Sequence, residues 1–264
     1  MKVVLTIAGS DSSGGAGIQA DLKTFEAFGV FGTSVITVLT AQNTQGVTDI
    51  MPLSPDFVNS QLQAIFNDFN ISAIKIGMLY SNEIIDVIRE FIKELNIPIV
   101  FDPVCISKAG ANLLNDDAVE NLQTLLQYAT VTTPNIFEAK KIFGYEFGNS
   151  ASLEKILQAP CAVVIKNHKT EINNSFRSID TLYKNKEKKI FDTPYQQSTN
   201  THGTGCSYSS AITANLALGK TLEESIQSAK EFIDIAIANA PKIGHGKGPI
   251  AHKIGGEICH MRDI

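Results

Sequence analysis

Residues 3–22 read VVLTIAGSDSSGGAGIQADL, and this stretch sets the expectation for the whole fold. Residues 3–8 form a short apolar run that is typical of a buried strand. A glycine-rich segment, residues 9–17, then ends the strand, because glycine permits the left-handed backbone of a tight turn. Apolar side chains follow at helical spacing, at Ile18, Leu22, Phe25 and Phe28. The stretch therefore predicts a strand, a turn and a helix in that order.

The same alternation continues along the chain. We expect further strands at 34–41, 73–78, 99–101, 129–133 and 162–165, and an edge hairpin formed by 181–183 and 189–191. Helical patterns fall between them, at 58–69, 85–95 and 119–126, and then at 206–218 and 221–240. Such alternation predicts an α/β protein with a mostly parallel sheet and helices on both faces. The polar stretch 166–189 is interpreted as surface loops and the edge hairpin.

Composition excludes several classes of protein. The 264 residues are 44% hydrophobic and carry a net charge of −5, which is ordinary for a globular protein and gives no basic stripe for nucleic acid. No window is apolar for long enough to span a membrane, and no signal peptide is visible. The four cysteines lack metal-ligand spacing, so a reduced, cytoplasmic protein is expected; they are Cys105, Cys161, Cys206 and Cys259.

A second glycine-rich stretch, residues 200–207, reads NTHGTGCS and directly precedes a helical pattern. Gly203 and Gly205 flank Thr204, so the backbone can turn its N–H groups outward at the start of the helix. Those donors and the helix dipole favour an anion, most often phosphate. Cys206 lies at the mouth of this loop, where we expect the helix terminus to lower the pKa of its thiol. A Cys206–His202 nucleophile pair is the alternative interpretation.

Ligands of parallel sheets bind beyond the carboxyl ends of the strands, and the predicted strand ends are polar or glycine-rich. They carry Gly9, Asp11, Gln42, Met78, Asp102, Asn135 and Lys166. Gln42 offers the donor and acceptor that an aminopyrimidine edge requires, and Met78 can pack on a flat ring, although each residue taken alone is more simply interpreted as a loop glutamine or a core methionine.

Charged residues at the same edge suggest phosphate and metal binding. Glu138 and Asn135, together with Asp102, are candidate partners of a hydrated magnesium ion, although an acid in the first turn of a helix is common. Lys166 ends a buried strand and either reaches a nucleotide phosphate or keeps its ammonium in water. The glycine-rich loop around Lys247 is a candidate border for a nucleotide base.

At these residues the chain resembles the hydroxymethylpyrimidine and phosphomethylpyrimidine kinases of thiamine biosynthesis, within the ribokinase-like superfamily. The resemblance runs from Val3 to about His252. The matching pieces are AGSDSSGGAGIQADLKT at 8–24, AQNT at 41–44, KIGM at 75–78, DPV at 102–104, TPN with the following Glu138 at 133–135, and HGTGC at 202–206. So many ordered matches are far more specific than any one of them.

The resemblance implies a three-layer α/β/α fold with a small edge hairpin, in a single domain over residues 1–264, and a homodimer. It implies phosphorylation of 4-amino-5-hydroxymethyl-2-methylpyrimidine by magnesium ATP, and then of the monophosphate to the diphosphate. The implied roles are pyrimidine binding by Gly9, Asp11, Ala16, Gln42, Met78 and Val104; ATP binding by Lys166, Thr204 and Lys247; metal binding by Asp102, Asn135 and Glu138; an anion hole of Gly203, Thr204 and Gly205; and a catalytic base at Cys206.

The chain departs from the family pattern in four places. Residues 166–168 read KNH where relatives usually carry Lys-Gly-Gly-His, and residues 105–110 vary a loop that relatives use as a flap. The stretch 144–161 is short for a helix with its connections. Residues 255–264 extend beyond the resemblance and have no assigned role.

Three other functions remain open from the sequence. A pyridoxal kinase shares the fold and many of the motifs, although residues 42–44 resemble the pyrimidine enzymes more. A pyrimidine-binding regulator without catalysis would need only the ring-binding residues. A cysteine hydrolase would use Cys206 and His202 and would need no ATP.

Overall fold

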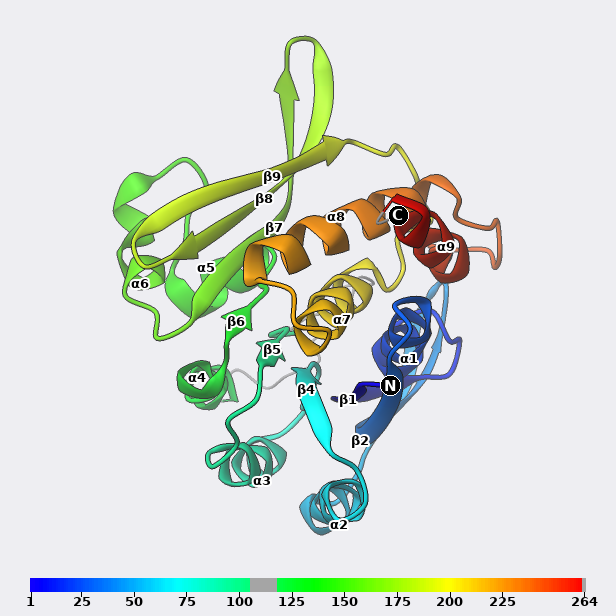
Figure 1. Cartoon of the computed structure of the whole chain (residues 1–264), viewed down its shortest axis with the longest axis vertical. Helices are drawn as coiled ribbons and strands as arrows, with labels where there is room; N and C mark the ends of the chain where they lie inside the picture. Colours follow the sequence, from blue (N-terminus) through cyan, green and yellow to red (C-terminus); the bar gives the residue numbers. More distant parts are fainter. Residues whose placement is uncertain (105–117, 263–264) are drawn as a thin grey trace.

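The computed structural model describes residues 1–104 and 118–262. Its strands form one nine-stranded sheet (Figure 1). The strands are β1 (Val3–Asp11), β2 (Phe31–Asn43), β3 (Gly46–Pro52), β4 (Ile71–Ile76), β5 (Ile99–Phe101), β6 (Val131–Thr132), β7 (Ala162–Ile172), β8 (Ser175–Lys184) and β9 (Glu187–Pro194). Their spatial order is β3-β2-β1-β4-β5-β6-β7-β8-β9. The six central strands in this order, β2, β1, β4, β5, β6 and β7, run parallel. Antiparallel strands close both edges, β3 on one side and β8 and β9 on the other.

Helices cover both faces of this sheet, which confirms the predicted three-layer α/β/α fold (Figure 1). Neighbouring residues on β1 point to opposite faces, so Leu5 and Val4 belong to two separate cores. The core around Leu5 contains residues of α2 (Pro55–Phe66), α3 (Asn82–Ile92), α4 (Ala118–Gln123), α5 (Ile136–Phe143) and α6 (Glu154–Leu157). The core around Val4 contains residues of α1 (Gly17–Ala27), α7 (Thr204–Ala217), α8 (Leu222–Ala238) and α9 (His252–Arg262).

Several elements differ from the sequence-based expectation. Strand β3 was not expected, because none of its residues is buried and an edge strand leaves little hydrophobic pattern. The predicted hairpin is present as β8–β9, but the stretch 166–180, interpreted as surface loops, continues β7 and begins β8. Asn173 and Asn174 form the turn between them with φ angles of 50° and 60°. Asparagine tolerates this left-handed region, which suits a two-residue hairpin.

Two stretches without a clear expectation from the sequence also have a defined structure. Residues 252–262 form α9, so most of the extension without a role is a helix packed on α1 and α8. The short stretch 144–161 holds a 3₁₀ turn (Ser150–Leu153) and α6. The varied loop 105–110 lies outside the described residues. No helix in the described part of the chain is both long and apolar enough to cross a membrane.

Candidate active site

A cleft of about 490 Å³ lies beyond the carboxyl ends of the parallel strands. Every residue that the sequence singled out for a site lines it: Gly9, Asp11, Ala16, Gln42, Met78, Asp102, Val104, Asn135, Glu138, Lys166, Gly203, Thr204, Gly205, Cys206 and Lys247. These residues come from strand ends in both halves of the sheet, from the start of α7 and, for Lys247, from the loop between α8 and α9. The structure thus brings the predicted ring-binding and phosphate-binding regions to one shared cavity.

Asp11 organises the first glycine turn. Its Oδ1 accepts hydrogen bonds from the backbone N–H and the hydroxyl of Ser13, and its Oδ2 accepts from the N–H groups of Gly15 and Ala16. The same Oδ2 lies 2.8 Å from Nε2 of His202. Burial alone would raise the pKa of Asp11, but His202 and these donors lower it to about 2. The carboxylate therefore stays ionised and holds two loops together.

The glycine turn and the loop before α7 touch directly. Gly203 has φ of 79°, and a Cβ atom there would lie 1.9 Å from the carbonyl oxygen of Gly15. Gly15 is restricted as well, because its Cβ would lie 2.2 Å from Cδ2 of His202. Only glycine permits both the left-handed conformation and this close approach. The N-termini of α1 and α7 consequently meet at the cleft, where their N–H groups favour an anion.

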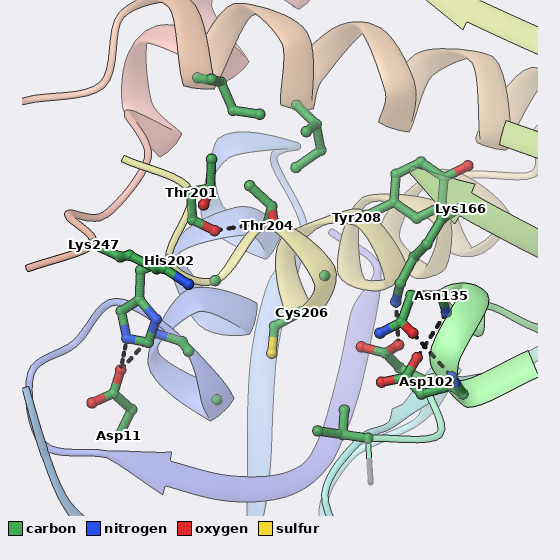
Figure 2. A pocket seen from close by; sticks show the side chains of 18 of the residues that line it. Asp11, Asp102, Asn135, Lys166, Thr201, His202, Thr204, Cys206, Tyr208 and Lys247 are labelled. Atoms are coloured by element: carbon green, nitrogen blue, oxygen red, sulfur yellow. Dashed lines mark hydrogen bonds and ion pairs between the residues drawn. The ribbon is translucent and has the colours of Figure 1, made fainter. Parts of the chain in front are cut away.

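Cys206 projects from the first turn of α7 into the cleft, between the Asp11–His202 pair and the Asp102–Lys166 pair (Figure 2). The expectation of a lowered thiol pKa is wrong. Burial raises the pKa of Cys206 to about 11, and this outweighs Lys75 and the backbone N–H of Gly17, which act in the opposite direction. The thiol is therefore protonated at neutral pH. Nε2 of His202 is bonded to Asp11, so the structure gives no support to a Cys206–His202 nucleophile pair.

The other end of the cleft has an apolar wall with an amide beside it. Met78 packs with Val38 and Val104 in a small apolar cluster. A Cβ at Gly9 would lie 2.8 Å from Cγ1 of Val38, so glycine lets the backbone approach this wall. Oε1 of Gln42 lies 3.1 Å from the hydroxyl of Thr40, and its Nε2 lies 3.4 Å from Nε2 of His202. This end can accept a flat polar ring.

Lys166 has a partner, so the interpretation of a rim lysine with its ammonium in water is wrong. Its Nζ lies 2.5 Å from Oδ1 of Asp102, and the side chains are 10% and 1% exposed. Burial would raise the pKa of Asp102, but Lys166 and Lys75 lower it. Burial raises the pKa of nearby Glu138 to about 7. Glu138 and Asn135 form a capping box on α5, in which each side chain accepts the backbone N–H of the other.

Within residues 1–104 and 118–262, no group of three or more histidine, cysteine, aspartate or glutamate side chains is arranged to hold a metal ion by itself. Magnesium, however, commonly keeps several waters and binds one or two carboxylates together with substrate phosphates. Glu138 and Asp102 line the cleft together with the 203–206 loop. These oxygen donors fit a hydrated magnesium ion beside phosphates, and they do not form a complete protein cage.

The sequence reasoning missed a buried pair under the cleft, Lys75 and Asp21. Nζ of Lys75 lies 2.8 Å from Oδ2 of Asp21, and both side chains are 0% exposed. The signal was present, because a lysine between Ile74 and Ile76 in a buried strand requires a partner. Other lining residues that the sequence reasoning missed include Ser178 and Asp180 on β8, Thr193 on β9, Tyr195 directly after β9, and Lys230, Ile233 and Ile237 on α8. Lys230 pairs there with Asp180 at 3.1 Å.

A ribokinase-like fold in which a glycine-rich loop at a helix N-terminus and an apolar pocket share one cleft is typical of small-molecule kinases. Comparison with known proteins identifies the group more closely. The family model for phosphomethylpyrimidine kinase matches residues 11–251. The chain belongs to the phosphomethylpyrimidine kinase family.

Individual relatives support this assignment. The hydroxymethylpyrimidine/phosphomethylpyrimidine kinase of Haemophilus influenzae is 45% identical, over 96% of this chain and 97% of that protein. The crystal structure of phosphomethylpyrimidine kinase from Clostridium difficile is 41% identical with a TM-score of 0.76, over 90% of this chain and 100% of the other. An ADP complex of Bacillus subtilis pyridoxal kinase is 35% identical with a TM-score of 0.86, over 96% and 98%.

Proposed function

We infer that the chain phosphorylates 4-amino-5-hydroxymethyl-2-methylpyrimidine with ATP, and then converts the monophosphate to the diphosphate, in thiamine biosynthesis. Its family membership supports this activity. The observation that carries the assignment of residues is the shared cleft, in which Gln42 and Met78 lie at one end and the 203–206 loop faces the same space. A ring held beside Gln42 and Met78 would present its hydroxymethyl group toward Cys206.

The proposed chemistry is an in-line phosphoryl transfer that depends mainly on positioning and charge neutralisation. In the first reaction the Cys206 thiol first releases its proton to water, and the thiolate then takes the proton of the substrate hydroxyl. The hydroxyl oxygen bonds to the γ-phosphorus of ATP, and ADP leaves. The N–H groups of the 203–206 loop stabilise the charge on the transferred phosphoryl group. In the second reaction the acceptor is already a phosphate oxygen, so little deprotonation is needed.

We place the nucleotide phosphates between Lys166, Thr204 and Lys247, with Tyr195, Ile233 and Ile237 offering apolar surface for the nucleoside. Asp102, Asn135 and Glu138 would hold the magnesium ion, chiefly through water. The ion would neutralise phosphate charge that builds up during transfer. Lys166 keeps its positive charge in this site, because Asp102 and Glu138 raise its pKa against the effect of burial.

Phosphorylation of pyridoxal is a second candidate activity. The pyridoxal kinase of Bacillus subtilis superimposes with the higher TM-score of the two solved structures, although its sequence is less similar. Pyridoxal and the pyrimidine are both flat rings that bear a hydroxymethyl group, so the same apolar wall can accept either. We propose that pyridoxal is the poorer substrate, because the Gln42 amide matches an aminopyrimidine edge.

One incubation tests these assignments. The purified chain is given magnesium ATP with the hydroxymethylpyrimidine or with pyridoxal, and mono- and diphosphorylated products are separated by chromatography. We expect both pyrimidine products and slower pyridoxal phosphorylation. Binding without turnover would indicate the catalytically inactive regulator. Product formation without ATP, abolished by an alkylating agent, would indicate the cysteine hydrolase.

Two lysine variants sharpen the result. Lys166→Met removes the buried partner of Asp102, and we expect turnover to fall by at least about 100-fold. Lys184→Met removes an exposed lysine, paired with Glu223 at 3.3 Å, and we expect turnover to stay within about twofold. Equal activities of the two variants would contradict the placement of the nucleotide.

The homodimer and the cytoplasmic location remain predictions. Gel filtration at several protein concentrations tests whether the chain forms a homodimer.

A further inference from the structure

Two buried ion pairs lie beneath the helix that carries Cys206, and consecutive serines of that helix contact them. The Ser210 hydroxyl donates to Oδ1 of Asp21 at 2.7 Å, and the Ser209 hydroxyl donates to Oδ2 of Asp102 at 3.3 Å. Cys206 and Ser210 are four residues apart on α7, so they share one face of the helix. The Lys75–Asp21 pair is therefore one helical turn from Cys206.

The position of the Lys75 ammonium is tightly fixed. Oδ2 of Asp21 accepts from both Lys75 and the Thr6 hydroxyl, at 2.8 and 2.6 Å. A Cβ added at Gly77 would lie 2.6 Å from Nζ of Lys75, so glycine makes room for the charge. Lys75 also lines the cleft, together with Cys206. Removing one partner from such a pair is strongly destabilising, and replacing both by neutral residues is often tolerated.

We propose that Lys75 is a positioning residue for the first phosphorylation, which acts through Cys206: its buried ammonium supplies the positive potential that lets the thiol release its proton to water, so that the thiolate can accept the proton of the substrate hydroxyl. This inference rests on the proposed role of Cys206 as the base. It goes beyond the 203–206 loop, because the positive charge comes from a side chain of β4.

Charges from four elements face the thiol, and they do not act in the same direction. Lys75 on β4 favours the thiolate, whereas Asp21 on α1 and Asp102 after β5 disfavour it. Lys166 on β7 interacts with the same thiol. Of the charges that act on Cys206, Lys75 has the largest effect, and it opposes the burial that raises the thiol pKa. Loss of this one ammonium should therefore raise the thiol pKa further.

The test measures the thiol itself. The full chain without substrates is treated with iodoacetamide across a range of pH, and alkylation of Cys206 is followed by peptide mass spectrometry, which separates it from the other cysteines. Cys206 is only partly buried and lines the cleft, so a small reagent can reach it. For Lys75→Met we expect alkylation at pH 8 to slow by about tenfold, with the midpoint of the pH profile shifted upward.

The double variant Asp21→Asn/Lys75→Met keeps the shape of the pair without its charges and guards against misfolding of the single variant. We expect its midpoint also to move upward, by less than in Lys75→Met. Lys230→Met is the matched control, because it removes another buried lysine from the same cleft, and we expect its Cys206 profile to match that of the wild type. A folded Lys75→Met or double variant with an unchanged midpoint would overturn the proposal.

Kinetics separate this proposal from the function on which it rests. For Lys75→Met we expect kcat of the first phosphorylation to fall at least tenfold, KM for the pyrimidine to stay unchanged, and the second phosphorylation to lose less. If the wild-type chain did not phosphorylate pyrimidines, the proposed function would fail while the alkylation profiles still decided whether Lys75 acts on the thiol. Equal losses in both phosphorylations would count against Lys75 acting through Cys206.

Discussion

Oδ2 of Asp11 and Nε2 of His202 lie 2.8 Å apart, although the two residues are separated by 191 positions in the chain. Asp11 ends β1 and His202 precedes α7, so the contact joins the first glycine turn to the loop at the start of α7 (Figure 2). The carboxylate that makes it also fixes the N–H groups of Gly15 and Ala16. The two halves of the site therefore depend on one side chain for their relative placement.

Asp11→Asn should weaken both the fold and the activity. Asparagine has nearly the same shape, but it lacks the charge and one of the two acceptor oxygens that these bonds require. We expect a loss of about 1–3 kcal/mol in the free energy of unfolding and at least a tenfold fall in kcat/KM for the pyrimidine. Denaturant titration and steady-state kinetics measure the two effects.

Asp192→Asn is the control for this variant. Asp192 pairs with Arg177 at 2.6 Å, but the two side chains are 30–44% exposed. Exposed pairs contribute little, so we expect a change of less than about 1 kcal/mol and unaltered kinetics. If both variants lost the same stability and activity, the special role of Asp11 would be refuted.

Gly203→Ala should lower kcat far more than Gly219→Ala, which changes a glycine of similar backbone conformation. Gly203 and Gly219 have φ of 79° and 90°, so alanine meets the same backbone strain at both. Nothing lies within 4 Å of a Cβ at Gly219, whereas the Gly15 carbonyl would lie 1.9 Å from a Cβ at Gly203. We expect Gly219→Ala to cost about 1 kcal/mol with full activity, and Gly203→Ala to lose at least about 100-fold in kcat. Similar kcat values for the two would show that the close approach is unimportant.

Cys206→Ala should affect the two phosphorylations unequally. The first acceptor is an alcohol that must lose a proton, and the second is a phosphate oxygen that is already ionised. We expect kcat of the first step to fall by about 100-fold, which is typical for loss of a general base, and that of the second step by much less. Separate assays that start from the pyrimidine and from its monophosphate give the two rates. Equal losses would remove Cys206 from the role of base.

The order of strands and helices in the parallel region could be predicted, because buried strands such as 3–8 and amphipathic helices such as 85–95 have a clear hydrophobic period. Strand β3 could not, because its side chains are all at least partly exposed. Helix α9 was missed because Gly255 and Gly256 disfavour a helix. Tertiary packing reverses that preference: a Cβ at Gly255 would lie 2.8 Å from the Phe232 ring, and one at Gly256 would lie 2.6 Å from the carbonyl oxygen of Ala27.

The candidate site could likewise be predicted only in part. Short motifs at strand ends located the lining residues, since parallel topology brings those ends together. The sequence could not reveal that His202 faces Asp11, because the contact joins distant segments. It also gave the wrong direction for the thiol pKa of Cys206: a helix terminus lowers it, but the burial of this thiol has the larger effect.

The burial of His252 should make stability depend on pH. Nε2 of His252 lies 2.9 Å from the Ser207 hydroxyl, and burial lowers the pKa of the imidazole to about 4. Between pH 6.5 and 4 the unfolded chain binds a proton at this residue and the folded chain does not, so stability falls as the pH decreases. The contribution is at most about 3 kcal/mol.

His252→Gln should therefore flatten the pH dependence of unfolding between pH 4 and 6.5, even though it lowers stability at pH 7. Thermal or denaturant unfolding at a series of pH values measures this slope. His245→Gln, at an exposed position of the neighbouring loop, should leave the slope as in the wild type. A His252→Gln slope identical to that of the wild type would contradict the assignment.

The attachment of Ser209 and Ser210 to two separate buried ion pairs limits how this enzyme can change shape. A slide or rotation of α7 by one residue would detach both hydroxyls from their carboxylates at once. Exchange of substrates must then be accommodated by segments around the helix, while Cys206 keeps a constant position. Engineering toward new acceptor rings should accordingly change the wall formed by Met78 and Val104 and keep the residues of α7 unchanged.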